Sequence, residues 1–189
     1  MRTHIAAAAL LVAVATLTAC STTEPTVNTK PAKKSAPAKD AAKPKASPTE
    51  QAGVGDTLTL HGMDDGSQLD VTLVKWVDNA KSADEFTSPE KGNKWVAAQF
   101  KIVNTGTAVY SDSPSNGAQV ADEQGQQFNP TFATITAGPE MQAGVRLAKG
   151  ATALGYITFE VPKTSKIATL QLALDSGFAD ESGQWQIAK

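Results

Sequence analysis

Cysteine and histidine are almost absent from this sequence of 189 residues. Cys20 is the single cysteine, so no disulfide can form within the chain. The histidines are His4, which lies in the N-terminal segment that a signal peptide would occupy, and His61. Ser-His-Asp or Cys-His catalysis would therefore depend on His61 alone, and no G-x-S-x-G motif is present. The sequence therefore predicts that the protein is not an enzyme. A hydrolase that uses a pair of carboxylates stays as a less favoured alternative, because residues 53–189 contain sixteen acidic side chains.

A long hydrophobic run is also missing. The apolar stretch at residues 5–17 is shorter than the roughly 20 residues that a membrane-spanning helix needs. Arg2 precedes it, and Leu17-Thr18-Ala19-Cys20 follows. This pattern predicts a signal peptide over residues 1–19. An ordinary secreted protein cleaved after Ala19 is the alternative.

The Leu-Thr-Ala-Cys sequence resembles the lipobox of bacterial lipoproteins. The resemblance implies that the Cys20 thiol carries diacylglycerol, that cleavage occurs just before it, and that the mature chain is attached to the extracytoplasmic face of the cell membrane.

Aromatic and large aliphatic side chains are missing from residues 20–52, apart from Val27. Proline, alanine and lysine dominate this segment, and such a composition predicts a disordered linker with a mean span of about 30 Å. Residues 21–52 have six lysines and three acids, a net charge of +3, whereas residues 53–189 have ten basic and sixteen acidic residues, a net charge of −6. The lysines either keep the linker extended or contact anionic lipid and wall phosphate. A domain of negative charge excludes nucleic acid as a partner.

Alternating hydrophobicity without any long helical period predicts a domain of about eight short strands over residues 53–189. The expected strands cover residues 56–60, 69–77, 94–104, 118–121, 126–128, 155–161, 167–174 and the region around Trp185 and Ile187. Strands of this number and spacing predict an all-β, antiparallel sandwich of the immunoglobulin-like type. The alternation also predicts a buried face, made of Val71, Leu73, Val96, Ala98, Phe100, Ile102, Ile157, Phe159, Leu170 and Leu172.

Several short segments together resemble the DUF4352 family. They are Gly55-Asp56-Thr57, the strand from Lys94-Trp95-Val96 to Val103-Asn104-Thr105-Gly106, the turn Asp122-Glu123-Gln124-Gly125 with Phe128, and Gly150 with Phe159-Glu160-Val161-Pro162. The resemblance implies an immunoglobulin-like sandwich on a lipoprotein or secreted protein, most often of a Gram-positive bacterium. It implies no catalytic residue.

Neither a metal nor a cofactor is expected. His61 and Met63 offer ligands suited to copper, but only Met141 could join them, and a stable site needs three or four donors. Asp64, Asp65 and Asp70 provide oxygens for calcium without the spacing of an EF-hand loop, and a turn between strands explains Asp65-Gly66.

The sequence thus indicates a membrane-anchored envelope lipoprotein whose domain is a non-catalytic binding module for a protein, a peptide or a cell-wall component. A structural or antigen-like surface domain without a small ligand is the alternative. Tyr110 and Phe132 lie in connections expected at one end of the sandwich, and our hypothesis places both on a partner-binding face. The alternative is that the long connection around Phe132 contains a further strand or packs on the core.

Overall fold

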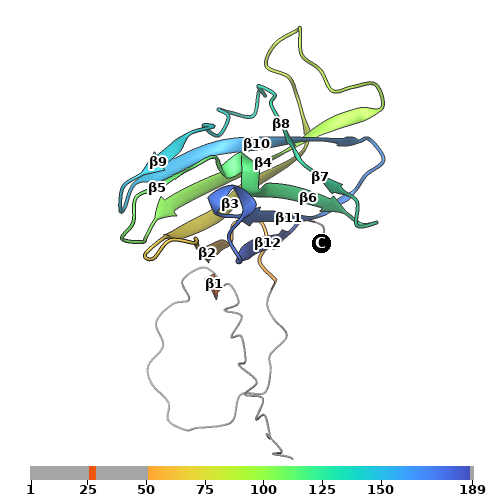
Figure 1. Ribbon diagram of the computed structural model, residues 1–189. Coiled ribbons are helices and arrows are strands. Elements are labelled where there is room, and N and C mark those ends of the chain that lie inside the picture. Colours follow the sequence, from red (N-terminus) through yellow and green to blue (C-terminus); the bar gives the residue numbers. More distant parts are fainter. Residues whose placement is uncertain (1–25, 29–50, 188–189) are drawn as a thin grey trace, which may run out of the picture.

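The computed structural model describes residues 26–28 and 51–187 (Figure 1). The predicted signal peptide, the lipidation site Cys20 and most of the predicted linker lie outside the described residues. No helix in the described part of the chain is long and apolar enough to cross a membrane.

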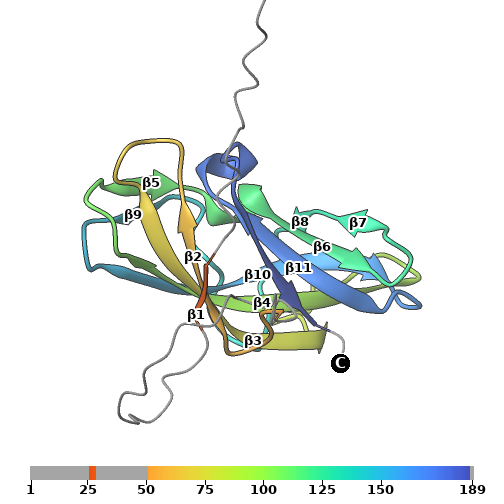
Figure 2. The same cartoon turned by 90° about the horizontal axis from the view of Figure 1, so that it is seen from below.

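Two antiparallel sheets face each other and enclose the core (Figures 1 and 2). The first sheet has the strand order β1-β2-β3-β4-β10-β8. Its strands are β1 (Thr26–Asn28), β2 (Thr57–His61), β3 (Gln68–Ala80), β4 (Asn93–Asn104), β8 (Pro130–Thr131) and β10 (Thr152–Pro162). The two longest pairings, β3 with β4 and β4 with β10, form its centre.

The second sheet has the order β12-β11-β6-β7. Its strands are β6 (Ala118–Asp122), β7 (Gln127–Phe128), β11 (Ile167–Ala173) and β12 (Ser182–Gln186). A separate pair is formed by β5 (Tyr110–Asp112) and β9 (Val145–Leu147). Every pairing between these strands is antiparallel, so the predicted all-β antiparallel sandwich is confirmed.

The core between the sheets consists of the side chains that alternation predicts. All ten residues of the predicted buried face are buried in one hydrophobic cluster. Phe100 of β4 meets Trp185 of β12 edge to face, with ring centroids 5.5 Å apart, so this pair joins the two sheets across the core. The Trp185 indole also donates a hydrogen bond to the Asp56 carbonyl oxygen at 3.2 Å.

A second, smaller cluster covers the opposite face of β4. Trp95 and Ala97 of β4 are buried there with Tyr156 of β10, and the segment around Ala133 and Ile135 lies over them. Backbone hydrogen bonds fix this cover, because Ala83 donates to Thr134 and Thr136 donates to Lys81, both at 2.9 Å. Strand β4 is therefore buried on both faces, which explains why its odd- and even-numbered positions both carry hydrophobic side chains.

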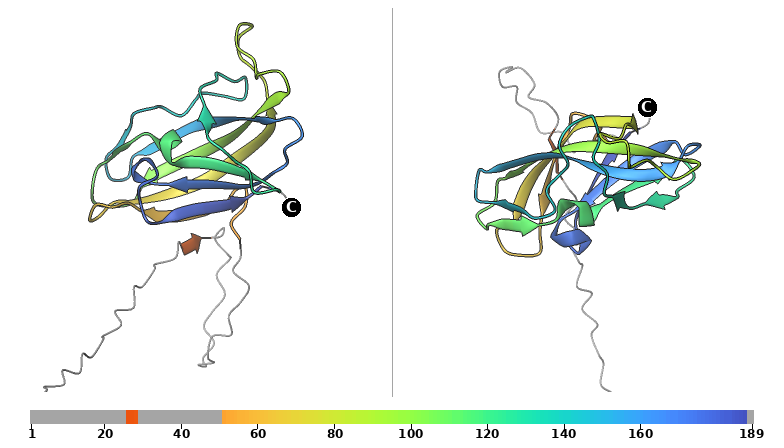
Figure 3. Two further views of the ribbon diagram at one scale, coloured as in Figure 1. Left: turned by 45° about the vertical axis from the view of Figure 1, so that its right-hand side comes forward. Right: turned by 90° about the horizontal axis from the view of Figure 1, so that it is seen from above.

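Four strands were not predicted. Strand β1 lies within the predicted disordered linker and pairs with β2 in the register Thr26↔Thr59 and Asn28↔Thr57. Ala52, the last residue of the predicted linker, is buried, and its carbonyl oxygen accepts a hydrogen bond from the Gln186 backbone N–H at 2.7 Å. The long connection at residues 129–150 contains β8 and β9, so the alternative of a hidden strand is the correct one there. Strand β5 lies in the connection at residues 105–117, where no strand was expected. By contrast, the β3–β4 connection projects beyond the sheets (Figure 3).

Candidate functional site

The outward face of the second sheet carries polar side chains and no charge. Inward and outward residues alternate along β6, β11 and β12, and the inward ones include Val120, Leu172 and Trp185. The outward side chains of the four strands, all of them described by the structure, are those of Gln119, Ala121, Gln127, Thr169, Gln171, Ala173, Ser182, Gln184 and Gln186. We call this set the amide face. It stands out in a domain of ten basic and sixteen acidic residues.

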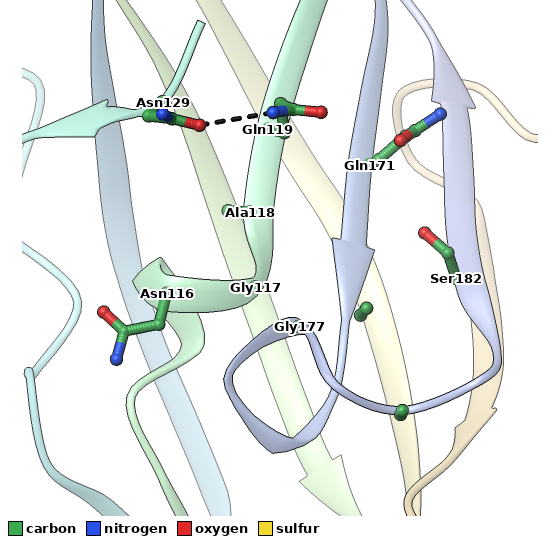
Figure 4. Close-up of a pocket in the computed structure, with 10 residues that line it drawn as sticks. Asn116, Gly117, Ala118, Gln119, Asn129, Gln171, Gly177 and Ser182 are labelled. Carbon is green, nitrogen blue, oxygen red and sulfur yellow. Dashed lines mark hydrogen bonds between the residues drawn. The ribbon is translucent and has the colours of Figure 1, made fainter.

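A row of amide side chains crosses this face. Strand register places Gln119 opposite Gln171, and Gln171 opposite Gln184. Gln171 donates a hydrogen bond to the Gln184 side-chain oxygen at 2.9 Å. Asn129, just beyond β7, extends the row, because its side-chain oxygen accepts a hydrogen bond from Gln119 at 3.2 Å (Figure 4). These contacts orient the four amides, whose remaining donors and acceptors stay available to a ligand.

An open hollow of about 300 Å³ lies alongside this row. It is lined by Asn116, Gly117, Ala118, Gln119, Asn129, Gln171, Ala173, Gly177, Ala179 and Ser182 (Figure 4). Amide and hydroxyl groups supply its polar atoms, and no residue of the lining is charged. The lining contains no acid, base or strong nucleophile, so it can form hydrogen bonds but cannot perform general acid–base catalysis.

Close packing of two turns forms the floor of the hollow. The 3-10 turn η1 (Pro114–Gly117) approaches β11 so closely that a Cβ added to Gly117 would lie 2.0 Å from the Ala173 carbonyl oxygen. Only glycine fits at this contact. The second turn, η2 (Asp175–Gly177), contains Asp175 and Ser176 at φ angles of 53° and 55°, which non-glycine residues rarely adopt.

A carboxylate holds this unusual turn in place. Asp112 of β5 accepts hydrogen bonds from the Ser176 backbone N–H and from its hydroxyl, both at 2.6 Å. Asn116 donates to the Ser176 hydroxyl oxygen at 3.3 Å, and Asp175 accepts from the Met63 backbone N–H at 2.6 Å. Since four hydrogen bonds from three residues outside the turn hold it, its geometry at the edge of the hollow is fixed by the fold. Phe178, which follows η2 between two lining residues, is 78% exposed.

Comparison with known proteins identifies the domain. The sequence profile described as "Domain of unknown function (DUF4352)" matches residues 63–182, more than half of the chain. The chain belongs to the DUF4352 family. The matched segment contains β6, β7 and β11 and ends at Ser182, so Gln184 and Gln186 of the amide face lie beyond it. No curated protein matches the chain significantly in sequence.

Solved structures share the fold of this DUF4352 domain at low sequence identity. The ycdA protein of Bacillus subtilis, described as a candidate lipoprotein, matches with a TM-score of 0.50 and 14% identity over 68% of this chain. That match covers 38% of ycdA, so the chain spans well under half the length of that protein. The yjhA protein of Bacillus subtilis matches with a TM-score of 0.50 and 15% identity, over 72% of this chain and 99% of its own. The secreted protein MPT63 of Mycobacterium tuberculosis gives a TM-score of 0.49 and 16% identity, over 71% of this chain and 95% of its own.

The two predicted partner contacts of the DUF4352 domain have different environments. Tyr110 begins β5 opposite Leu147 and is 6% exposed, within the main hydrophobic cluster. Burial raises the pKa of its hydroxyl, and the carboxylates of Asp112 and Asp175 add to this effect. Its side chain is not accessible to a partner, so the hypothesis is wrong for this residue. Phe132 follows β8 and is 82% exposed, so its contact with a partner stays a prediction.

The residues weighed as metal ligands have other contacts. His61 Nδ1 lies 2.8 Å from Glu181 Oε2, Met141 is buried in the core, and Met63 is 68% exposed. Asp70 accepts a hydrogen bond from the Thr59 hydroxyl at 2.8 Å. Within residues 51–187, no group of three or more His, Cys, Asp or Glu side chains could hold a metal ion.

The amide face is hard to recognise in the sequence because it contains none of the charged, aromatic or nucleophilic groups that usually mark a site. A usable signal is nevertheless present in β11, where Thr169, Gln171 and Ala173 alternate with buried residues, and again in Ser182, Gln184 and Gln186 of β12. Because side chains alternate along a strand, these residues of β11 are predicted to share one face, and so are those of β12. The strand register, which aligns neighbouring strands across the sheet, could not be obtained from the sequence.

Proposed function

We propose that this chain is an extracytoplasmic lipoprotein whose β-sandwich is a non-catalytic binding module, and that the amide face is its binding surface. The observation that carries the proposal is a whole sheet face with aligned amides and an open hollow but no charge. Surface strands of an acidic domain ordinarily carry charges that keep the protein soluble. A face that lacks these charges but presents aligned polar groups is better explained by ligand binding than by solvation alone.

The location at the membrane is supported by the sequence. Leu17-Thr18-Ala19-Cys20 follows an apolar stretch of signal-peptide length, and Cys20 is the only thiol to which lipid could be attached. In this proposal the lipid on Cys20 holds the chain at the outer face of the membrane. The binding module then reaches protein, peptide or wall components through the segment that separates Cys20 from residue 51.

The absence of reactive groups at the amide face favours binding over catalysis. Amide side chains do not titrate in the physiological range, and the hollow is lined by amides, a hydroxyl, alanines and glycines. A structural surface domain without a ligand is the competing function. A purely structural role predicts that the amide face tolerates a charged substitution without loss of function. A single substitution therefore distinguishes the structural role from the binding role.

The test uses the full chain carrying Cys20→Ala, so that lipid does not hold it in the membrane. Mixed with isolated cell envelopes of the source bacterium, this chain should sediment with them. Adding Gln171→Glu places a carboxylate at the centre of the amide row, where a ligand would have to desolvate it, and should remove most of the bound fraction.

The matched control is Gln142→Glu, which makes the same change of charge at an exposed glutamine outside the amide face. Both variants should keep the melting temperature of the parent, because both positions are solvent-accessible. Equal sedimentation of the two variants would contradict the assignment of the amide face, and no sedimentation of the parent would contradict a binding function in the envelope.

A further inference from the structure

The amide face also indicates the chemical class of its ligand. We propose that it binds an uncharged, hydroxyl-rich polysaccharide chain, an inference that rests on the proposed function and names the ligand of the same surface. Three features carry it: the chemistry of the side chains, their spacing across the strands, and the small residues that flank them.

Side-chain chemistry selects for neutral hydroxyl groups. A glutamine or asparagine amide offers two N–H donors and one carbonyl acceptor, and a sugar hydroxyl offers one donor and two acceptor lone pairs. Each partner can therefore donate and accept at once. An anionic polymer or an acidic peptide would need lysine or arginine, and a basic peptide would need carboxylates, but the described outward residues of β6, β7, β11 and β12 include neither.

The spacing of the row suits a linear polymer that runs across the strands. Neighbouring strands lie about 4.8 Å apart. Gln184, Gln171 and Gln119 occupy directly opposed positions on three neighbouring strands, and Asn129 continues the line. An extended chain laid along this line meets an amide at each strand and follows the edge of the hollow, which Gln171, Gln119 and Asn129 line.

Small side chains leave room for such a chain beside the row. Ala173 of β11 and Ser182 of β12 pair with each other on the side of the hollow, and Ala121 of β6 lies on the other side of the row. These short side chains let a ring lie close to the sheet. Phe178 lies in the chain between the lining residues Gly177 and Ala179 and is 78% exposed, so it offers a nearby aromatic surface for the apolar C–H face of a sugar ring.

The amide–amide hydrogen bonds prepare the face for binding. Gln171 bonds to Gln184 at 2.9 Å and Gln119 to Asn129 at 3.2 Å, so the side chains are already restricted before a ligand arrives. Less rotamer entropy is then lost on binding than for four free amide side chains. The Asp112 contacts at 2.6 Å fix the turn beside the hollow in the same way.

Calorimetric titration tests this inference with the full chain carrying Cys20→Ala. The probes are maltohexaose, cellohexaose, chitohexaose and the neutral polysaccharide fraction of the source bacterium's wall, with heparin as a charged comparison. At least one neutral probe should bind, and its affinity should change less than about twofold between about 0.05 and 0.5 M NaCl, because no ionic contact is screened.

The double substitution Gln119→Ala with Gln171→Ala should weaken this binding at least about tenfold, since each removes a hydrogen-bonding side chain from the row. Gln142→Ala is the matched control and should leave the affinity unchanged. Binding that both sets of variants weaken equally would place the ligand elsewhere and overturn the inference.

Other outcomes also overturn it, and they separate it from the proposed function. If no neutral probe binds while envelope sedimentation still depends on Gln171, the amide face binds something other than a neutral polysaccharide and the proposed function stands. If heparin alone binds and salt abolishes the binding, the ligand is anionic. If the parent sediments as a dimer that the double substitution dissociates, the amide face is an interface between two copies of this chain.

Discussion

Single carboxylates organise several of the loops in this domain. Asp122 is buried, and it accepts hydrogen bonds from the Gln124 and Gln126 backbone and from the Ser165 hydroxyl, at 2.9 to 3.1 Å. The Asp84 carboxylate accepts hydrogen bonds from the hydroxyl and the backbone N–H of Thr87 and from the backbone N–H of Phe86. These contacts lower the pKa of Asp84. Part of the acidic composition is therefore structural, because these carboxylates accept hydrogen bonds from turn N–H groups that have no backbone acceptor.

Glu160 of β10 gives a prediction about pH. Its carboxylate accepts hydrogen bonds from the Glu90 backbone, the Asn93 amide and the Trp95 indole, at 2.9 to 3.0 Å. Burial raises the pKa of this carboxyl, but the three hydrogen bonds together outweigh burial, so the pKa lies below its ordinary value. Because solvent screens this site in part, Glu160→Gln should lower the free energy of unfolding by only about 0.5 to 1 kcal/mol at pH 7.

The sign of the pH dependence follows from the lowered pKa. The contribution of Glu160 is complete above the unfolded pKa of about 4.3 and is lost as the pH falls through the folded pKa. The difference between wild type and Glu160→Gln in urea unfolding should therefore shrink between pH 7 and about pH 3. Glu85→Gln, at an exposed glutamate, is the control and should show little difference at either pH. A gap for Glu160→Gln that stays constant with pH would contradict the assignment.

The strands show how far the sequence determines this fold. Strands β2, β3, β4, β6, β7, β10, β11 and β12 match the segments predicted from the sequence, because each packs one face against the main core. Strands β5, β8 and β9 are two or three residues long, too short for a period to be recognised. Strand β7 is equally short, but the turn Asp122-Glu123-Gln124-Gly125 before it indicates a hairpin. Strand β1 ends at Asn28, far before β2 begins at Thr57, and it forms through pairing that local composition does not reveal.

The candidate site was less predictable than the strands. Parity indicates which glutamines point outward, but the alignment of Gln119, Gln171 and Gln184 depends on the register of three strands. The register of β11 shifts between Ile167 and Thr169, so counting along the sequence alone fails there. Tyr110 was misplaced for a related reason, since the pairing of β5 with β9 buries a residue that lies in an apparent loop.

Core packing of β4 provides a prediction at the level of the strand. Phe100 is fully buried and packs against Trp185 of the other sheet. Phe100→Ala should lower the free energy of unfolding by about 3 to 5 kcal/mol, because it removes this ring and leaves a cavity. Phe132→Ala makes the same change at a side chain that is 82% exposed, and should cost no more than about 0.5 kcal/mol. Denaturant unfolding of both variants measures the contrast, and equal losses would show that the assigned register of β4 is wrong.

The whole molecule combines a basic segment with an acidic domain. Residues 21–52 have a net charge of +3 and residues 53–189 a net charge of −6. Anionic lipid attracts the first and repels the second. At a membrane surface we therefore expect the domain to stand away from the lipid, with the amide face accessible to polymers of the envelope. This arrangement requires an anchor other than the domain itself.

Cys20 is the proposed anchor, and its replacement tests the arrangement of the whole molecule. A lipid chain contributes about 0.8 kcal/mol of membrane affinity for each buried CH₂ group, so removing the acyl chains should release an acidic domain that has little affinity of its own. Cys20→Ala should move the protein from the detergent-rich phase to the aqueous phase in a detergent partition experiment and abolish incorporation of labelled fatty acid. Ser21→Ala, one residue further on, leaves the thiol in place and should behave like wild type. If Cys20→Ala remained wholly in the detergent phase, the chain would have to be held at the membrane by contacts other than lipid on Cys20, and the amide face would then have to be reconsidered as one of them.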